Sequence, residues 1–205
     1  MVALLLTECV GTFFLVLTIL MSGQPIAIGL MLAIMIYIGG HISGGHYNPA
    51  ITLAVWLRGK LNTKLLAPYM LSQLVGAFIA AALNRYLTGK ILCTIPASSI
   101  DTFRAITIET LGTFVLCATV LAVATNEKLK GNFVYGFAIG LSLTTIIMFG
   151  SASGGAFNPA VGTGPILFDF IINGPATLKY LIIYLTGPFI GGLLSALFYK
   201  YTTAN

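Results

Sequence analysis

The chain has 205 residues, of which 58% are hydrophobic and only 7% are charged, and its formal net charge is +5. Soluble domains carry about 25% charged residues, so this composition, with a mean hydropathy of +0.99, excludes an ordinary soluble domain and predicts a polytopic membrane protein. The ten Lys and Arg residues stand singly near the ends of apolar runs, which argues against a nucleic-acid surface.

Long apolar runs predict six membrane spans, and we therefore expect an all-α membrane protein. The predicted spans cover residues 3–22, 25–40, 65–87, 103–124, 133–150 and 178–200. The first run contains Glu8 and has no Lys or Arg before it, so it is interpreted as a retained span and not as a cleaved signal peptide.

Two apolar runs are too short to cross a bilayer. The run 49–57 would extend roughly 13–14 Å as a helix at ~1.5 Å per residue, under half of a ~30 Å hydrocarbon core. The run 159–170 is the second of these. Both are predicted to be re-entrant half-helices.

An eight-residue pattern precedes and opens each half-helix. Residues 43–50 read Ser-Gly-Gly-His-Tyr-Asn-Pro-Ala, and residues 153–160 read Ser-Gly-Gly-Ala-Phe-Asn-Pro-Ala. Asn is a good helix N-cap, and Pro fits the first helical turn, where its missing N–H costs nothing. Each copy therefore predicts an irregular segment, an Asn cap and then a helix.

The repeat extends through the whole chain, which we interpret as one channel domain of residues 1–205 with halves at about 1–100 and 101–205. Glu8-Cys-Val-Gly-Thr-Phe13 matches Glu109-Thr-Leu-Gly-Thr-Phe114, and Ala27-Ile-Gly-Leu30 matches Ala138-Ile-Gly-Leu141. Each half holds three spans, so the second copy must be inverted in the membrane. Interrupted helices at matching places in inverted halves indicate a site near the bilayer midplane.

Irregular backbone at membrane depth is tolerated where it packs in protein or lines a water-filled cavity. The predicted pore centre consists of Asn48, Pro49, Ala50, Asn158, Pro159 and Ala160. Backbone carbonyls lining the pore are expected from Gly44, Gly45, His46, Ser153 and Gly154. Two half-helix N-termini directed at one point give a positive potential there, since each N-terminus is equivalent to about half a positive charge. This arrangement would disfavour cations while neutral hydrogen-bonding solutes pass.

Glu8 and Glu109 are single carboxylates inside apolar spans, where such residues are costly and usually functional. A proton relay is one interpretation. Their duplication at equivalent places favours the other, in which each accepts backbone N–H bonds and supports its re-entrant segment.

His41 and His46 flank the first Gly-Gly pair, and the second copy has Ser151 and Ala156 instead. A role in orienting a carbonyl or in sensing pH at the pore mouth is favoured over a metal site. Cys9, Cys93 and Cys117 are too far apart in sequence for a metal motif. No metal, cofactor or catalytic constellation is predicted, so an enzyme is not expected.

These motifs resemble the aquaporin family, also called the major intrinsic proteins. The resemblance covers nearly the whole chain: both Asn-Pro-Ala boxes, both Glu-x-x-Gly-Thr-Phe segments and Gly187-Pro-Phe-Ile-Gly-Gly192 in the last span. It implies a six-span bundle with one pore per subunit, a homotetramer in the lipid bilayer, and passive flow of water and small neutral solutes.

The resemblance also implies an outer constriction of four residues, which are Ile28, Ile147 (or Ile146), Gly155 and Val161. Most members of the family have Arg where this chain has Val161, and water-selective members usually have His at the fifth-span position. Val supplies neither the bulk nor the charge and donors of Arg. A wider, more apolar filter is expected, with urea, ammonia, hydrogen peroxide or glycerol as candidate solutes beside water.

Three alternatives to the broad channel remain at this point. One is a water-only channel, and another is a structural membrane tetramer with a closed pore. A secondary transporter would need a coupling-ion site, and the predicted spans hold only two carboxylates. Six basic residues fall on the side that holds both termini against four on the other, which favours cytoplasmic termini.

Overall fold

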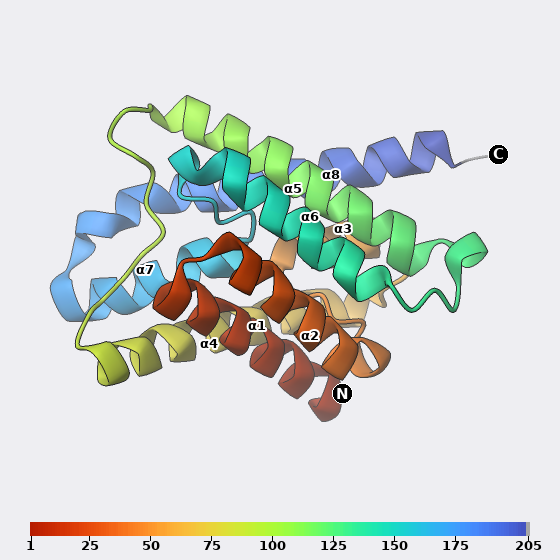
Figure 1. Ribbon diagram of the computed structural model, residues 1–205, viewed down its shortest axis with the longest axis horizontal. Coiled ribbons are helices and arrows are strands. Elements are labelled where there is room, and N and C mark those ends of the chain that lie inside the picture. Colours follow the sequence, from red (N-terminus) through yellow and green to blue (C-terminus); the bar gives the residue numbers. More distant parts are fainter. Residues whose placement is uncertain (204–205) are drawn as a thin grey trace.

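In the computed structural model, which describes residues 1–203, six helices are long and apolar enough to cross a membrane. Two shorter helices, α3 and α7, interrupt this series (Figure 1). The α-helices are α1 Val2–Ser22, α2 Pro25–Ser43, α3 Pro49–Leu57, α4 Thr63–Thr88, α5 Thr102–Thr125, α6 Tyr135–Gly150, α7 Pro159–Asn173 and α8 Leu181–Thr202. The 3-10 helices are η1 Glu127–Leu129, η2 Ser151–Ser153 and η3 Pro175–Tyr180. The predicted all-helical membrane fold is confirmed.

One of the two half-helices is longer than the sequence predicts. Helix α3 has the predicted bounds, whereas α7 extends three residues beyond the predicted end at Phe170. The helix continues because Ile171 and Ile172 are apolar helix-compatible residues and the Asn173 amide donates to Asp169 Oδ1 at 2.7 Å. It ends at Gly174, which has a positive φ of 89°.

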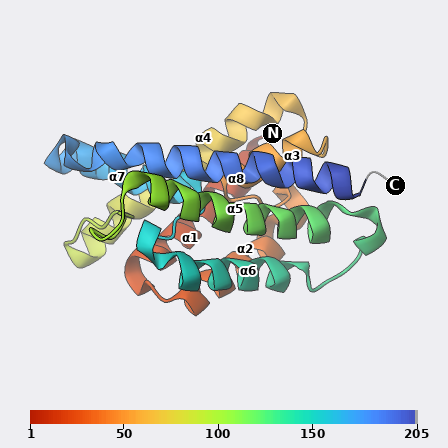
Figure 2. The same cartoon turned by 90° about the horizontal axis from the view of Figure 1, so that it is seen from above.

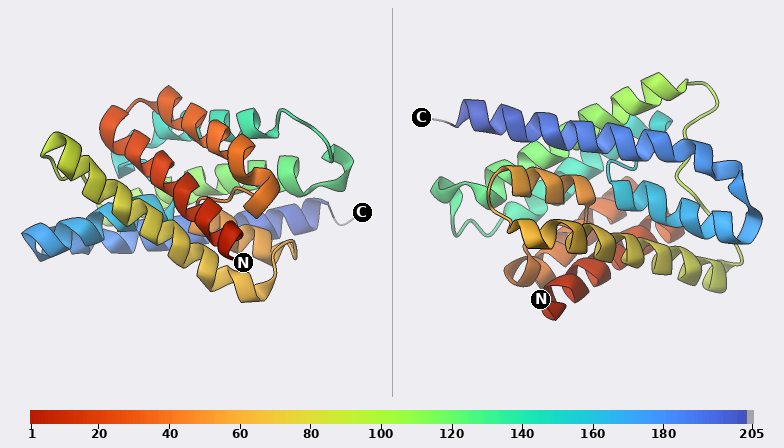
Figure 3. Two further views of the ribbon diagram at one scale, coloured as in Figure 1. Left: turned by 90° about the horizontal axis from the view of Figure 1, so that it is seen from below. Right: turned by 180° about the vertical axis from the view of Figure 1, so that it is seen from behind.

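The long helices pack in pairs that follow the repeat. Helix α1 packs along α4, and α5 packs along α8 in the second half, while α2 packs on α6 and joins the halves. Figure 2 shows α5 lying beside α8. The half-helices cross over between the halves, because α3 contacts α8 and α7 contacts α4. Helix α3 lies toward the end of the bundle that holds the C-terminus and α7 toward the other end (Figure 3).

Glycine allows backbone contact at each main pair of helices. A methyl group on Gly140 would collide with the carbonyl oxygen of Gly29, across the α2–α6 contact. Gly76 lies against the carbonyl of Cys9 where α4 meets α1. Gly191 lies against Thr110 where α8 meets α5. Small residues at such positions let helices approach closely in a membrane, where van der Waals packing drives their association.

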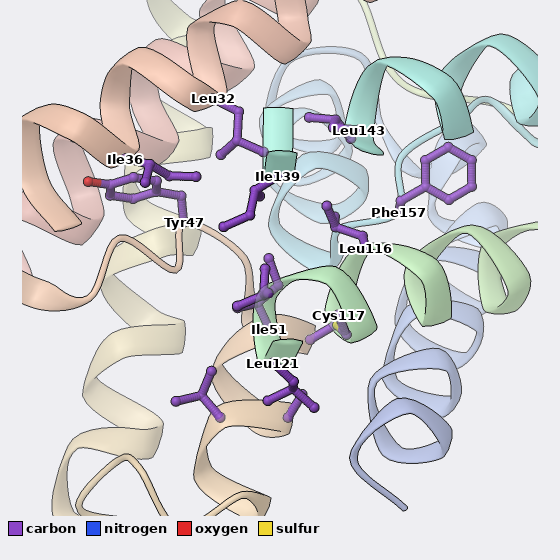
Figure 4. Packing of buried hydrophobic residues seen from close by; sticks show 14 of the residues in the cluster. Leu32, Ile36, Tyr47, Ile51, Leu116, Cys117, Leu121, Ile139, Leu143 and Phe157 are labelled. Carbon is purple, nitrogen blue, oxygen red and sulfur yellow. The ribbon is translucent and has the colours of Figure 1, made fainter. Parts of the chain in front are cut away.

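The buried aliphatic cluster lies between the two re-entrant loops. Leu116 and Leu143 belong to this cluster, and Tyr47 and Phe157 lie on opposite sides of it (Figure 4). Both aromatic rings are fully buried. The residues that precede the two Asn caps are therefore part of the core, and the loops that carry them are fixed by packing.

We expect Gly140→Ala to lower the free energy of unfolding by about 1–3 kcal/mol, because the added methyl forces α6 away from Gly29. Unfolding of the full chain in detergent, followed by circular dichroism, measures this. Leu141→Phe adds more volume on the exposed side of the same helix and is the control. Equal stability of Gly140→Ala and the wild type would show that this close approach is not important for the fold.

Candidate functional site

The two Asn-Pro-Ala boxes form helix starts of the same geometry. Asn48 and Asn158 are the N-caps of α3 and α7, and a Pro follows each at the first helical position. The Oδ1 atom of Asn48 accepts from the Ala50 N–H at 2.8 Å, and that of Asn158 accepts from the Ala160 N–H at 2.9 Å. The side-chain oxygens are thereby used within their own helices.

The side-chain nitrogens connect the two repeats. Asn48 Nδ2 donates to the carbonyl of Phe157 at 2.9 Å, and Asn158 Nδ2 donates to the carbonyl of Tyr47 at 2.9 Å. An amide nitrogen carries two hydrogens, so one N–H of each Asn remains for another acceptor. Both side chains line the same narrow cavity.

Glu8 on α1 is fully buried and accepts hydrogen bonds from four groups. The donors are the Ser43 hydroxyl at 2.6 Å, the His46 N–H at 3.0 Å, the Tyr47 N–H at 2.7 Å and the Gln73 amide at 2.7 Å. Two of these donors are backbone groups of the loop before α3. The carboxylate therefore satisfies N–H groups that have no helical partner.

Glu109 on α5 occupies the matching place in the second repeat. It accepts from the Ser153 hydroxyl at 2.7 Å, the Ala156 N–H at 3.0 Å and the Phe157 N–H at 2.6 Å. Its side chain is also fully buried. These bonds fix the loop before α7 in the same way.

Backbone strain explains why two carboxylates are needed. Tyr47 has a φ of 50° and Phe157 a φ of 48°, the left-handed region that bulky residues avoid. Such a conformation costs about 1–3 kcal/mol per residue and persists only where neighbours over-determine it. The Tyr47 ring packs against Gly11 and the Phe157 ring against Gly112. The Glu and the Gly of each Glu-x-x-Gly segment thus act on one aromatic residue.

The four residues expected at the constriction line one cavity. Ile28, Ile147, Gly155 and Val161 surround it together with the side chains of His46 and both Asn caps. The cavity volume is about 10 Å³, which is room for about one water molecule. Other walls are aliphatic, from Leu15, Ile19, Leu32, Ile51, Leu116 and Leu143.

The structure distinguishes the two residues considered for the fifth span. Ile147 lines the narrow cavity, whereas Ile146 is 1% exposed and belongs to the hydrophobic core. Helix α6 ends at Gly150, and the 3-10 turn η2 follows it directly. Because of this short turn before Gly154, counting residues back from the second Asn-Pro-Ala box does not by itself identify the fifth-span position.

The residues expected to supply carbonyls lie in different surroundings. Gly44 and His46 line a wider cavity, and His46 also lines the narrow one, whereas Gly45 packs against Gly40 and Ile36 of α2. Ser153 does not fit the predicted role, because it is fully buried and its carbonyl accepts from the Tyr184 hydroxyl at 2.9 Å. Gly154 packs against Thr94 and Ile95 of the α4–α5 loop.

The wider cavity, which we call the vestibule, has a volume of about 860 Å³ and is lined in part by the loop between α5 and α6. His46 lines both the vestibule and the narrow cavity, and so lies where they meet. An ion pair of 2.8 Å joins Lys60, after α3, to Glu127 on η1 at the vestibule wall.

The sequence-based prediction missed three polar residues of this site. Gln73 and Thr52 are fully buried and hydrogen-bonded near Glu8, and the Tyr69 hydroxyl donates to the Ser43 carbonyl at 2.9 Å. A lone Gln in an otherwise apolar span was the signal for Gln73. Thr52 lies one helical turn after Asn48, and its side chain carried no separate signal.

A family model, described as the major intrinsic protein family, matches residues 1–199. This chain belongs to that family. Members of the major intrinsic protein family are channels and not enzymes. The assignment agrees with the six apolar spans and the two half-helices of the structure.

Individual members and one solved structure are similar over most of the chain. An aquaporin AqpM of Methanothermobacter thermautotrophicus is 36% identical, with 88% of this chain and 76% of that protein aligned. A glycerol uptake facilitator protein-like 6 of Lactiplantibacillus plantarum is 31% identical, with 93% and 94% aligned. The aquaglyceroporin structure of Plasmodium falciparum superimposes with a TM-score of 0.83 at 23% identity and covers 97% and 95% of the two chains. This last likeness shows the fold.

We expect Glu109→Gln to destabilise the protein by about 3 kcal/mol or more, because the new amide group faces backbone N–H donors that need an acceptor. Denaturant unfolding of the full chain in detergent provides the measurement. Glu127→Gln is the matched control, since Glu127 lies in an exposed ion pair of little energetic weight. Equal stability of the two variants would contradict the supporting role of Glu109.

Lys60 lowers the pKa of the Glu127 carboxyl below its ordinary value through a hydrogen bond and its charge. A lowered pKa means that the ion pair is present at neutral pH and is lost as the pH falls through that lowered value. We expect Lys60→Met to raise the Glu127 pKa toward its ordinary value, measured by carboxyl NMR titration. An unchanged pKa in this variant would show that the two loops do not interact across the vestibule.

Proposed function

We propose that this chain is a passive membrane channel for water and small neutral solutes. The observation that supports this most directly is the narrow cavity where the N-termini of α3 and α7 meet. A cavity at the junction of two half-helices, joined to an 860 Å³ vestibule, is suited to carry solutes one at a time. Membership of a channel family supports the same function.

The centre of the pore is suited to neutral solutes. The free N–H groups of Asn48 and Asn158 offer donors to a passing oxygen. The two helix N-termini add a positive potential, which disfavours hydronium and other cations. A water that accepts from both Asn residues has its own hydrogens directed away from the centre on either side, which opposes proton hopping.

The chemistry of the proposed filter favours a channel that passes several kinds of small neutral solute. Val161 and Ile28 bring neither charge nor hydrogen-bond donors, and Gly155 has no side chain. Urea, glycerol, ammonia and hydrogen peroxide therefore join water as proposed solutes. One observation favours a water-only channel instead, because the cavity volume of about 10 Å³ is room for about one water molecule.

The surroundings of the channel are part of the proposal. We propose that both termini are cytoplasmic, because Arg58, Lys60, Lys128 and Lys130 lie in loops on that side and Lys64 lies in the first turn of α4. Glu8 and Glu109 act as supports for the re-entrant loops and not as a proton relay, since each is surrounded by the donors of one loop. Assembly as a homotetramer in the bilayer is proposed from the family resemblance.

Stopped-flow light scattering on proteoliposomes tests the function. Shrinkage under an impermeant osmolyte measures water flux, and re-swelling under urea or glycerol measures solute flux. Fast water flux with fast re-swelling supports the broad channel, and fast water flux alone supports the water-only channel. Flux no greater than that of empty liposomes would favour the closed structural tetramer and overturn the channel proposal.

We expect Val161→Arg to reduce urea and glycerol permeability by about tenfold or more relative to water, because the guanidinium adds bulk and charge at the constriction. The same proteoliposome assay measures the ratio. Val161→Leu adds bulk without charge and separates the two causes. Unchanged solute flux in Val161→Arg would show that this residue does not form the filter.

A further inference from the structure

The two re-entrant segments differ in one hydrogen-bonded network. In the first repeat, Gln73 and Thr52 connect the buried Glu8 to the ring of His46. The matching positions of the second repeat hold Pro188, Gly162 and Ala156. Gln73 and Pro188 match because each lies four residues after a tyrosine that donates to the corresponding serine carbonyl. The scaffold is shared by both repeats, whereas this network occurs in the first alone.

The orientation of the Gln73 amide is fixed by its neighbours. Its Nε2 donates to Glu8 Oε2 at 2.7 Å and to Thr52 Oγ1 at 2.9 Å. Turning the amide over would place Oε1 against the carboxylate. Thr52 therefore receives a hydrogen bond from Gln73 and uses its own hydrogen toward the Asn48 carbonyl at 3.0 Å.

This arrangement determines which nitrogen of His46 carries the proton. The Thr52 hydroxyl has one hydrogen, which is already donated, so Oγ1 can only accept from the ring. His46 Nδ1 lies 3.2 Å from Oγ1 and is consequently the protonated nitrogen of the neutral ring. Nε2 is left with a lone pair that accepts no hydrogen bond from residues 1–203.

The ring is placed between the two cavities. His46 lines both of them, and Nε2 lies beside Gly44, which lines the vestibule. The edge of the ring packs against Tyr69 with the ring centroids 5.4 Å apart, which limits its rotation. A solute that leaves the vestibule for the narrow cavity passes this nitrogen.

We propose that His46 is a specificity-determining residue whose Nε2 accepts a hydrogen bond from the permeating solute, and that Thr52 and Gln73 are positioning residues that fix this tautomer. The proposal rests on the channel function proposed above. The narrow cavity then offers a side-chain acceptor at His46 and side-chain donors at Asn48 and Asn158. This combination favours neutral solutes with both an O–H or N–H donor and an acceptor, such as water, urea and polyols, over solutes that only accept.

The first test measures the tautomer directly and needs no transport. His41→Gln leaves His46 as the one histidine of the chain. Nitrogen-15 NMR of this labelled variant in liposomes at neutral pH is expected to show a protonated Nδ1 and an unprotonated Nε2. Thr52→Val in the same background should move the proton to Nε2, whereas Thr52→Ser should leave it on Nδ1. A protonated Nε2 in the Thr52-containing protein would overturn the proposal whether or not the protein conducts.

The second test measures flux in proteoliposomes with His41 restored. Thr52→Val is expected to lower water and urea permeability by about tenfold, the size of effect expected when one hydrogen bond in the pore is lost. Thr52→Ser should stay within about twofold of the wild type. A loss of flux in Thr52→Val without a change of tautomer would show that Thr52 acts through packing, and would overturn the proposal. A wild type that does not conduct but shows the expected tautomer would contradict the channel function alone.

Discussion

The structure depends on the need to satisfy backbone N–H groups at membrane depth, where no bulk water is present. The loops before α3 and α7 leave such groups free, and one buried carboxylate per loop accepts them. Burying a charge is costly unless it is fully hydrogen-bonded, and three or four donors meet that condition. The same bonds hold Tyr47 and Phe157 in left-handed conformations, which direct each following Asn into its helix cap.

The two halves of the chain stabilise one another at the site itself. Each Asn amide donates to the carbonyl of the aromatic residue in the other repeat. The half-helices also pack across, α3 on α8 and α7 on α4. Neither half can therefore complete this pair of hydrogen bonds without the other. The inverted repeat makes this site possible, because it brings two equivalent helix N-termini to one spot from opposite ends of the bundle.

Much of this architecture follows from local patterns in the sequence. Asn-Pro pairs and apolar run lengths predicted the spans, the bounds of α3 and the meeting of the half-helices. Local patterns could not predict hydrogen bonds between residues far apart in sequence. Gln73 donates to Glu8, 65 positions away, and the Tyr184 hydroxyl donates to the Ser153 carbonyl. The extra turn of α7 and the choice of Ile147 over Ile146 also depend on tertiary packing and on the 3-10 turn η2.

In the channel proposed above, an apolar filter would change how ions are excluded. With Val161 at the proposed constriction, a fixed cation would not be available there to repel other cations, so the exclusion of ions would depend on the centre and on desolvation. An ion that enters between Ile28, Ile147 and Val161 loses most of its hydration without replacement, which is very costly. A neutral solute loses far less, and it regains hydrogen bonds at Asn48 and Asn158 immediately beyond. An apolar ring next to a donor-rich centre can thus exclude ions without a fixed charge, at the cost of weaker discrimination among neutral solutes.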